Sequence, residues 1–290
     1  MIPAQFDYVR PAAIHEALQI LVDREGEAKI LSGGYSLLPL LKLRLASPGL
    51  LVDIRDLDGL DEIVETSDGL RIGGRATHRQ IHENPVVAGY PMLVDAAGGI
   101  GDPQVRNWGT IGGSCAHADP SSDWPAVLLA TSASIVLQSA AGTRTVPARG
   151  FFVDTFQTAI EPTELLTEVI IPRAPRPSGS AYAKLERRAG DFATVGVAAQ
   201  LSLGPDGRIA SAGIGLTAVA EAPFAATGAE AALVGKEPNE ATFQAAGIAA
   251  AAESRPGTDS HGPVEYKRAM VKEMVVRALR IAADRAQAQR

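Results

Sequence analysis

Cysteine is almost absent from this chain, because Cys115 is the single one among 290 residues. One thiol cannot form an intrachain disulfide, and it cannot by itself hold an iron–sulfur cluster or a structural zinc ion. His117 has no neighbouring histidine or cysteine at ligand spacing, and the other histidines, His78 among them, are scattered. We therefore expect no metal site on this chain itself.

Long apolar runs and a surplus of positive charge are also missing. The longest apolar runs, such as residues 126–130, are far too short to span a membrane. The N-terminal residues lack the basic and apolar regions of a secretory signal. A formal net charge of −6 argues against general affinity for nucleic acid. These absences predict a cytoplasmic protein with no membrane span and no nucleic-acid partner.

Two familiar site patterns are absent as well. No serine sits in a Gly-x-Ser-x-Gly setting, so a hydrolase triad is unsupported. The glycines do not follow the Gly-x-Gly-x-x-Gly spacing of a Rossmann nucleotide fold, and that fold is therefore disfavoured.

Two glycine-rich segments are the most informative feature that the chain does contain. In the first, residues 30–36, an apolar run leads into Gly33-Gly34 with serines on both sides. The second, residues 106–123, contains Thr110-Ile111-Gly112-Gly113. Since glycine lacks Cβ, backbone N–H groups can approach an anion closely and form a cradle for phosphate oxygens. Two such cradles suit a ligand with two phosphates, so a dinucleotide is the first candidate.

Each segment also has a purely structural interpretation. A diglycine alone usually marks a tight turn, but a strand before Ser32 and a helix after Ser36 favour binding, because a helix N-terminus attracts phosphate. Asp123 can bind a ribose hydroxyl or simply cap the next helix, which has Pro125 in its first turn. Under the binding interpretation, a Gly112→Val change would obstruct the cradle.

The hydrophobic pattern predicts a mixture of helices and strands. We expect helices over residues 11–22, 37–45, 77–81 and 91–97, another beginning near 123, and an amphipathic C-terminal helix with Met270, Met274, Ala278 and Ile281 on one face. We expect strands over residues 29–31, 50–54, 62–65, 70–73, 133–137, 143–146, 168–171, 182–187, 195–203 and 209–216. Residues 98–123 are expected to form a long loop, and the proline-rich residues 172–179 are the best domain boundary.

A charge-dense segment, residues 184–191, lies between two of the expected strands. Such a run usually forms a solvated face. If one of its residues reaches a ligand, Lys184 is the plausible one, because an ammonium group can stabilise an anionic reduced flavin.

Three motifs together resemble the FAD-binding medium subunits of the molybdenum hydroxylases, a family that includes aerobic carbon monoxide dehydrogenase and the flavin part of xanthine dehydrogenase. The first motif is Ser32–Pro39 and the second is Arg106–Pro125. The third is Lys184–Asp191 together with the following Val195–Ala199. Tyr266-Lys267-Arg268, at the start of the last expected helix, also resembles the family. The resemblance runs along essentially the whole chain. One departure is Tyr35, where the family more often has His or Gln.

The resemblance implies an α+β fold in two domains. An FAD-binding domain of the vanillyl-alcohol-oxidase (PCMH) type would occupy residues 1–175, in two subdomains of about 1–57 and 58–175. A smaller α+β domain with an antiparallel sheet, like the C-terminal domain of the carbon monoxide dehydrogenase flavoprotein, would follow over residues 176–290.

The resemblance also implies where FAD binds. The pyrophosphate would lie on the loops of Ser32–Ser36 and Thr110–Gly113, the ribose at Asp123, and the flavin ring near Leu166 and Lys184. The full set of cofactor-binding residues that it implies is Leu31, Ser32, Gly33, Gly34, Tyr35, Ser36, Leu37, Ile100, Thr110, Ile111, Gly112, Gly113, Ala116, His117, Asp119, Asp123, Leu166 and Lys184. It implies no catalytic residue and no metal ligand here.

The function implied by the family is electron transfer within a larger assembly. Such a subunit passes electrons from the [2Fe–2S] clusters of a small partner, fed by a large molybdopterin subunit, through FAD to NAD, a quinone or oxygen. The expected assembly is a dimer of heterotrimers. Two alternatives stay open: a self-sufficient flavin-dependent oxidase or dehydrogenase of a small organic substrate, and a scaffold that has lost its cofactor.

Overall fold

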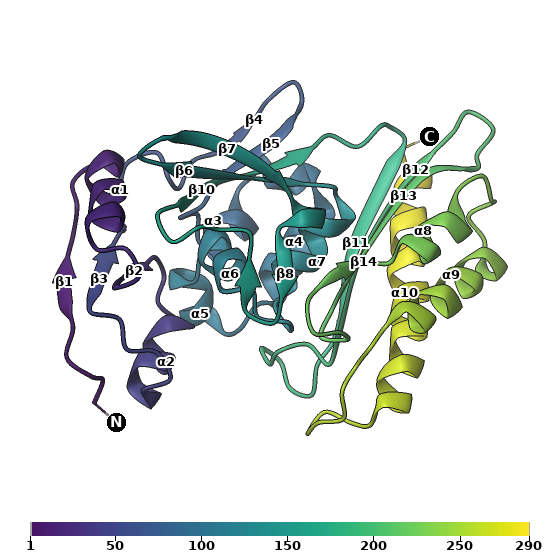
Figure 1. The fold of residues 1–290 in the computed structure, drawn as a ribbon. Helices are drawn as coiled ribbons and strands as arrows, with labels where there is room; N and C mark the ends of the chain where they lie inside the picture. The colour runs from purple at the N-terminus through teal and green to yellow at the C-terminus, as the bar shows by residue number, and fades with distance from the viewer. Residues whose placement is uncertain (1, 290) are drawn as a thin grey trace.

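The computed structural model describes residues 2–289 as three main sheets with helices between and outside them (Figure 1). The first is a parallel sheet in the order β1 (Asp7–Val9), β3 (Leu50–Asp53), β2 (Ala28–Leu31), accompanied by α1 (Ile14–Asp23) and α2 (Leu37–Leu43). Parallel strands bring their carboxyl ends to one edge of a sheet. The loop after Leu31 therefore leaves the sheet beside Asp53, with which Leu31 is in register.

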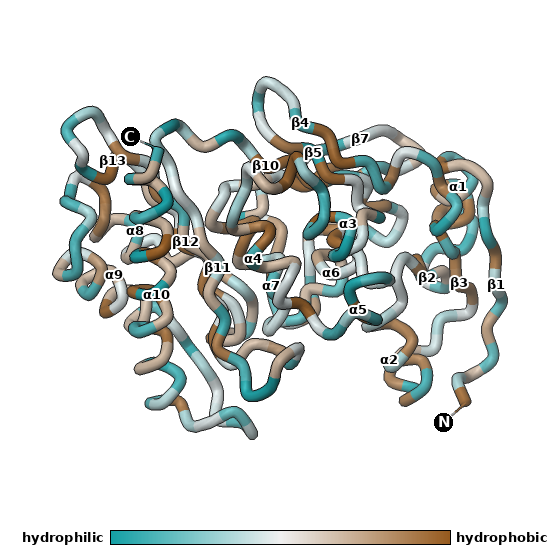
Figure 2. The backbone as a smooth tube through the Cα atoms, turned by 180° about the vertical axis from the view of Figure 1, so that it is seen from behind, coloured by the Kyte–Doolittle hydropathy of each residue, from teal (hydrophilic) through white to brown (hydrophobic). Residues whose placement is uncertain are grey.

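The second sheet is antiparallel and forms the middle of the molecule. Its order is β4 (Ile63–Glu65), β5 (Gly69–Gly73), β10 (Leu165–Pro172), β6 (Ser134–Ser139), β7 (Gly142–Pro147). The helices that accompany it are α3 (His78–Glu83), η1 (Val87–Gly89), α4 (Pro91–Gly99), α5 (Pro103–Trp108), α6 (Ile111–His117), α7 (Asp123–Ala130) and η2 (Ala148–Gly150), and the short pair β8 (Phe152–Asp154) and β9 (Gln157–Thr158) follows. The hydrophobic colour in Figure 2 gathers on β5, β10 and α4, in agreement with one buried cluster that includes Trp124 and Phe151.

The expected loop over residues 98–123 is wrong, because this stretch contains α5 and α6. Both helices are short, and each is started by a local cap: the side chain of Asp102 accepts from the Val105 N–H at 2.8 Å, and that of Thr110 accepts from the Gly113 N–H at 3.1 Å. A glycine-rich helix of seven residues has no apolar stripe for the sequence to reveal, and packing in the core sustains it instead.

The third sheet is antiparallel, in the order β11 (Ser178–Leu185), β12 (Val195–Leu203), β13 (Ile209–Thr217), β14 (Phe224–Ala225). Its outer face is covered by α8 (Thr227–Leu233) and α10 (Val264–Gln287), and α9 (Glu240–Glu253) packs on these two helices (Figure 1). From the side of the second sheet, α4 and α7 contact it. On α10 the expected apolar face is only partly correct. Met274 and Ala278 are buried, but Ile281 is 41% exposed.

Two glycines of β13 allow α7 to lie directly against the third sheet. A Cβ on Gly213 or Gly215 would overlap the carbonyl oxygen of Ala130 or Ala126, respectively. The contact is therefore backbone against backbone, and it fixes the position of the segment that begins with Asp123.

This contact gives a first prediction. We expect Gly215→Ala to lower the free energy of unfolding by about 1–3 kcal/mol, because the added methyl group must push the sheet and α7 apart. Urea denaturation measures the change. Gly89→Ala is the matched control, since a Cβ there meets no atom within 4 Å. Equal loss of stability in both variants would contradict the close approach.

Candidate functional site

The two glycine-rich segments, 70 or more residues apart in sequence, lie directly against each other. Gly33 sits on the backbone of Trp108 and Gly109, and a Cβ on Gly33 would overlap the Trp108 carbonyl oxygen. The hydroxyl oxygens of Ser32 and Thr110 lie 2.9 Å apart and share a hydrogen bond. The loop after β2 and the start of α6 therefore form one surface.

The loop Gly33–Ser36 presents backbone donors that the protein does not use. Within residues 2–289, none of the N–H groups of Gly33, Gly34, Tyr35 or Ser36 donates a hydrogen bond to another residue. Gly34 has a φ of +85°, a conformation that favours glycine. Tyr35 and Ser36 are exposed, so a ligand in solution can reach this loop. Successive N–H groups of this kind bind anions.

The second segment was expected to offer backbone N–H groups to a phosphate as the first does, but its N–H groups already have acceptors within the protein. The N–H groups of Ile111, Gly112 and Ser114 donate to the carbonyl oxygens of Ala76, Gly74 and Thr110, and that of Gly113 donates to the Thr110 hydroxyl. These groups hold α6 in place, and the segment offers a ligand mainly its hydroxyl groups.

The structure also corrects the expected effect of Gly112→Val. A Cβ on Gly112 would overlap the Gly74 carbonyl oxygen, so the side chain would strain the backbone behind α6 and would not enter a cradle. Gly113 faces the other segment: its Cβ would lie 2.8 Å from the Thr110 hydroxyl oxygen and 3.9 Å from the Ser32 Cβ.

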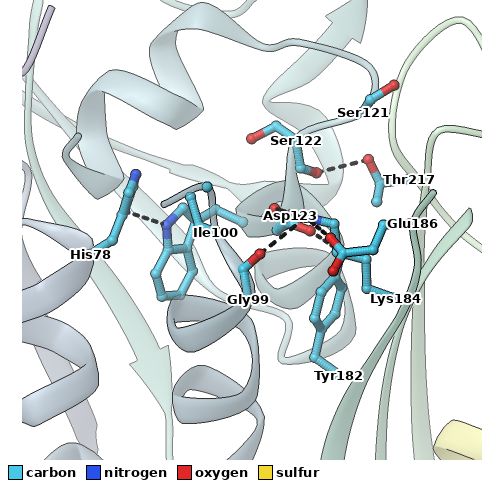
Figure 3. A network of polar contacts seen from close by, with 12 residues as sticks. His78, Gly99, Ile100, Ser121, Ser122, Asp123, Tyr182, Lys184, Glu186 and Thr217 are labelled. Carbon is cyan, nitrogen blue, oxygen red and sulfur yellow. Dashed lines mark hydrogen bonds and ion pairs between the residues drawn. The ribbon is translucent and has the colours of Figure 1, made fainter. Parts of the chain in front are cut away.

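Asp123 is the centre of a second group of polar residues, which we call the Asp123 cluster: Asp123, Tyr182, Lys184 and Glu186 (Figure 3). The Tyr182 hydroxyl donates to Asp123 Oδ1 at 2.5 Å, and Lys184 Nζ donates to Oδ2 at 3.3 Å. Lys184 Nζ also donates to the Gly99 carbonyl at 3.2 Å and lies 3.5 Å from Glu186 Oε2. One cation thus faces two carboxylates.

Burial shapes the electrostatics of this cluster. It raises the pKa of Asp123 above its usual value, and Lys184 and the hydrogen bond from Tyr182 act against that shift. Burial and the Asp123 charge raise the pKa of Tyr182 well above its usual value. Tyr182 therefore stays protonated and remains a hydrogen-bond donor at neutral and mildly alkaline pH.

Asp123 is not the cap of α7. The cap is Ser122, whose side chain makes no capping hydrogen bond, and Asp123 is the first helical residue. The Ser122 carbonyl accepts from the Thr217 hydroxyl at 2.8 Å. The Ser122 hydroxyl lies 2.6 Å from that of Ser114, which links the start of α7 to α6. Asp123 is thus free of the capping role that was the alternative to ligand binding.

The other residues implied by the resemblance lie around these two groups. Ile100 directly follows Gly99, whose carbonyl contacts Lys184, and Leu166 packs against Gly74 behind Gly112. The His117 ring packs on Phe156 with centroids 5.0 Å apart, and Asp119 accepts from the Ser121 N–H at 2.8 Å. Leu31, before the first diglycine, is buried, and Leu37, after it, is half-buried. Ala116, in the second segment, is exposed.

Sequence analysis missed Tyr182 and the contact between Gly33 and Trp108. Tyr182 and Lys184 alternate along β11 and therefore point to one face of the sheet. That alternation is visible in the sequence, but the neighbour of that face is not. Gly33 gives no signal beyond its residue type, because its partner is a distant backbone carbonyl.

Within residues 2–289, no helix is long and apolar enough to cross a membrane, and no three metal-ligating side chains gather into a site. Two family models match the chain: the FAD binding domain in molybdopterin dehydrogenase over residues 4–174, and the CO dehydrogenase flavoprotein C-terminal domain over residues 180–282.

Full-length relatives accompany these matches. The carbon monoxide dehydrogenase medium chain of Hydrogenophaga pseudoflava is 41% identical over 97% of this chain and 98% of its own length. The nicotine 6-hydroxylase medium subunit of Paenarthrobacter nicotinovorans is 37% identical over 94% of this chain and 95% of its own length.

Solved structures share the whole fold. A chain of carbon monoxide dehydrogenase from Hydrogenophaga pseudoflava superposes with a TM-score of 0.95 at 42% identity, covering 98% of this chain and 99% of that chain. A chain of quinoline 2-oxidoreductase from Pseudomonas putida 86 gives 0.92 at 36% identity, covering 99% of each. The expected α+β fold with a C-terminal antiparallel sheet is confirmed.

Proposed function

The chain belongs to the family of FAD-binding domains in molybdopterin dehydrogenases, and we propose that it transfers electrons between an iron–sulfur partner and an external acceptor. It is the FAD-binding medium subunit of a molybdenum hydroxylase and hence part of an oxidoreductase. When bound, FAD would take electrons from [2Fe–2S] clusters and pass them to NAD, a quinone or oxygen.

The observation that carries the site proposal is the loop Gly33–Ser36, whose four N–H groups have no acceptor within the described residues. Such a loop fits a pyrophosphate. Because these donors belong to the backbone, the departure at Tyr35 leaves them unchanged. The hydroxyls of Ser32 and Thr110 border the loop, and Asp123 with Lys184 would hold the ribose and the flavin end. Ile100, Leu166 and the remaining residues implied by the resemblance complete the proposed site.

The assembly and the domain division belong to the same proposal. Relatives carry the names of medium chains and medium subunits, which supports a small [2Fe–2S] partner and a large molybdopterin partner. We propose a dimer of these heterotrimers in the cytoplasm. We also propose the division into domains 1–175 and 176–290, which falls between the two matched ranges.

The test is a transfer of electrons between separate subunits. We expect the cognate [2Fe–2S] subunit, reduced chemically without oxygen, to bleach the visible flavin band of the oxidised chain while its own clusters reoxidise. A chain stripped of flavin is the control and should leave the clusters reduced. Clusters that stay reduced beside the flavin-loaded chain would contradict the proposal. Bleaching by an organic substrate in the absence of any partner would favour the self-sufficient oxidase.

A further inference from the structure

Tyr182 makes the shortest contact in the Asp123 cluster. Its hydroxyl is 2.5 Å from Asp123 Oδ1, whereas the Lys184 ammonium is 3.3 Å from Oδ2 (Figure 3). Asp123 lies on α7, next to the second sheet, and Tyr182 lies on β11 of the third sheet. The hydrogen bond therefore joins the two parts of the molecule at a residue that we place in the nucleotide site.

Building on the proposed function, we propose that Tyr182 is a positioning residue for FAD: it holds the Asp123 carboxylate in the orientation that accepts the ribose hydroxyls. A carboxylate has about four lone-pair sites. Tyr182 and Lys184 occupy one on each oxygen, so acceptor capacity remains for a nucleotide. The C-terminal sheet thereby completes a site that is otherwise built by the first 175 residues.

The position of the Tyr182 hydroxyl is fixed from two sides. Gly196, on the neighbouring strand β12, leaves open the space that the hydroxyl fills, since a Cβ there would overlap it. The Tyr182 backbone N–H donates to Asp95 Oδ2 at 3.2 Å, and Asp95 is held by both terminal nitrogens of Arg285 at 2.6 and 3.0 Å. A side chain held this firmly can define the orientation of its partner.

The charges around Asp123 give the proposal a pH signature. The groups that face it are Tyr182, Lys184 and Glu186, and the Asp95–Arg285 pair lies behind Tyr182. Burial and Glu186 raise the pKa of Asp123, while Lys184 and Tyr182 lower it. Removing the hydroxyl must raise that pKa further. A protonated carboxyl group accepts fewer hydrogen bonds, so the loss of FAD affinity should grow as the pH falls.

The experiment is a titration of the flavin-free full chain with FAD, followed by fluorescence, at pH 6, 7.5 and 9. We expect Tyr182→Phe to weaken FAD binding roughly tenfold at neutral pH, the size of one hydrogen bond to a charged acceptor. The loss should be larger at pH 6 and smaller at pH 9. In an Asp123→Asn background, Tyr182→Phe should cause little further loss.

Two controls separate positioning from a general loosening of the structure. Arg149→Gln breaks the Arg149–Glu230 pair, which joins η2 to α8 at another contact between the two parts of the molecule and touches neither Tyr182 nor Asp123. Tyr90→Phe removes another tyrosine–carboxylate hydrogen bond, to Glu65, away from the cluster. Wild-type affinity in Tyr182→Phe would overturn the proposal. A loss of FAD affinity that is equal at every pH and is matched by Arg149→Gln would also overturn it. If the wild-type chain itself binds no FAD, the proposed function fails instead.

Discussion

The Gly33→Ala chain is expected to lose its flavin. A Cβ at this position would overlap the Trp108 carbonyl oxygen, which belongs to the backbone and cannot swing away like a side chain. The loop and the 108–109 segment must therefore separate, and the N–H groups of Gly33–Ser36 change direction. Since each hydrogen bond to a charged phosphate contributes about 1.5–3 kcal/mol, losing two weakens FAD binding by roughly a hundredfold or more.

Flavin released by acid and counted per chain measures this loss, and a thermal melt shows whether the chain remains folded. Gly150→Ala is the matched control, because a Cβ there meets no atom within 4 Å. The Gly33→Ala chain should melt only slightly earlier than the wild type, since Gly33 lies in a half-exposed loop outside the hydrophobic clusters. A folded Gly33→Ala chain with its full flavin content would rule out the cradle at Gly33–Ser36.

The sequence was most informative where a signal is local. Strands were predicted over residues 195–203 and 209–216, and the observed strands β12 (Val195–Leu203) and β13 (Ile209–Thr217) match them closely. The turn residues Pro205-Asp206-Gly207 separate the two strands. The helix predicted over residues 77–81 is observed as α3, and Thr77 caps it together with Gln80 in a reciprocal pair of hydrogen bonds. Such patterns depend only on neighbours along the chain.

The sequence could not show which backbone N–H groups the fold itself uses. Both diglycines were expected to bind phosphate, but the N–H groups of Gly112 and Gly113 are used inside the protein, and those of Gly33 and Gly34 are not. The difference is made by the Gly74 carbonyl and the Thr110 side chain. The residue types of two similar motifs do not reveal which motif has N–H groups that already have acceptors within the fold.

The Asp123 cluster, where α7 contacts the third sheet, also could not be predicted in full from the sequence. Asp123 and Lys184 were each named as candidates, and the structure brings them together. Tyr182 was not named, because its importance depends on the pairing of β11 with β12 and on the contact of α7 with the third sheet. Alternation along a strand predicts which residues share a face, but the element that covers the face follows only from the tertiary arrangement.

We expect His78 to make the chain sensitive to acid. His78 is buried beside Trp124, whose indole N–H donates to His78 Nδ1 at 3.0 Å (Figure 3). Burial, assisted by the positive charge of Arg106, lowers the pKa of His78 to about 4 from its usual 6.5. The unfolded chain therefore binds a proton at a higher pH than the folded chain does. The stability that comes from the neutral ring is complete above pH 6.5 and is lost as the pH falls toward 4.

The expected loss is about 3 kcal/mol between these two pH values, because each unit of pKa difference contributes about 1.4 kcal/mol. Urea denaturation of the wild type and of His78→Gln at pH 7.5, 5.5 and 4.5 measures it. All other titrating groups are common to both chains, so the difference in unfolding free energy between them isolates His78. His15→Gln, at an exposed histidine, should follow the wild type. The backbone N–H of His78 donates to the Gly109 carbonyl, and the ring itself lies against Gly109, where an added Cβ would be 2.7 Å from Nε2, directly beside the segment that contacts Gly33. Protonation of the ring should therefore release flavin before the chain unfolds. If the difference in unfolding free energy between the wild type and His78→Gln stays constant from pH 7.5 to 4.5, His78 is not the group responsible for the acid sensitivity.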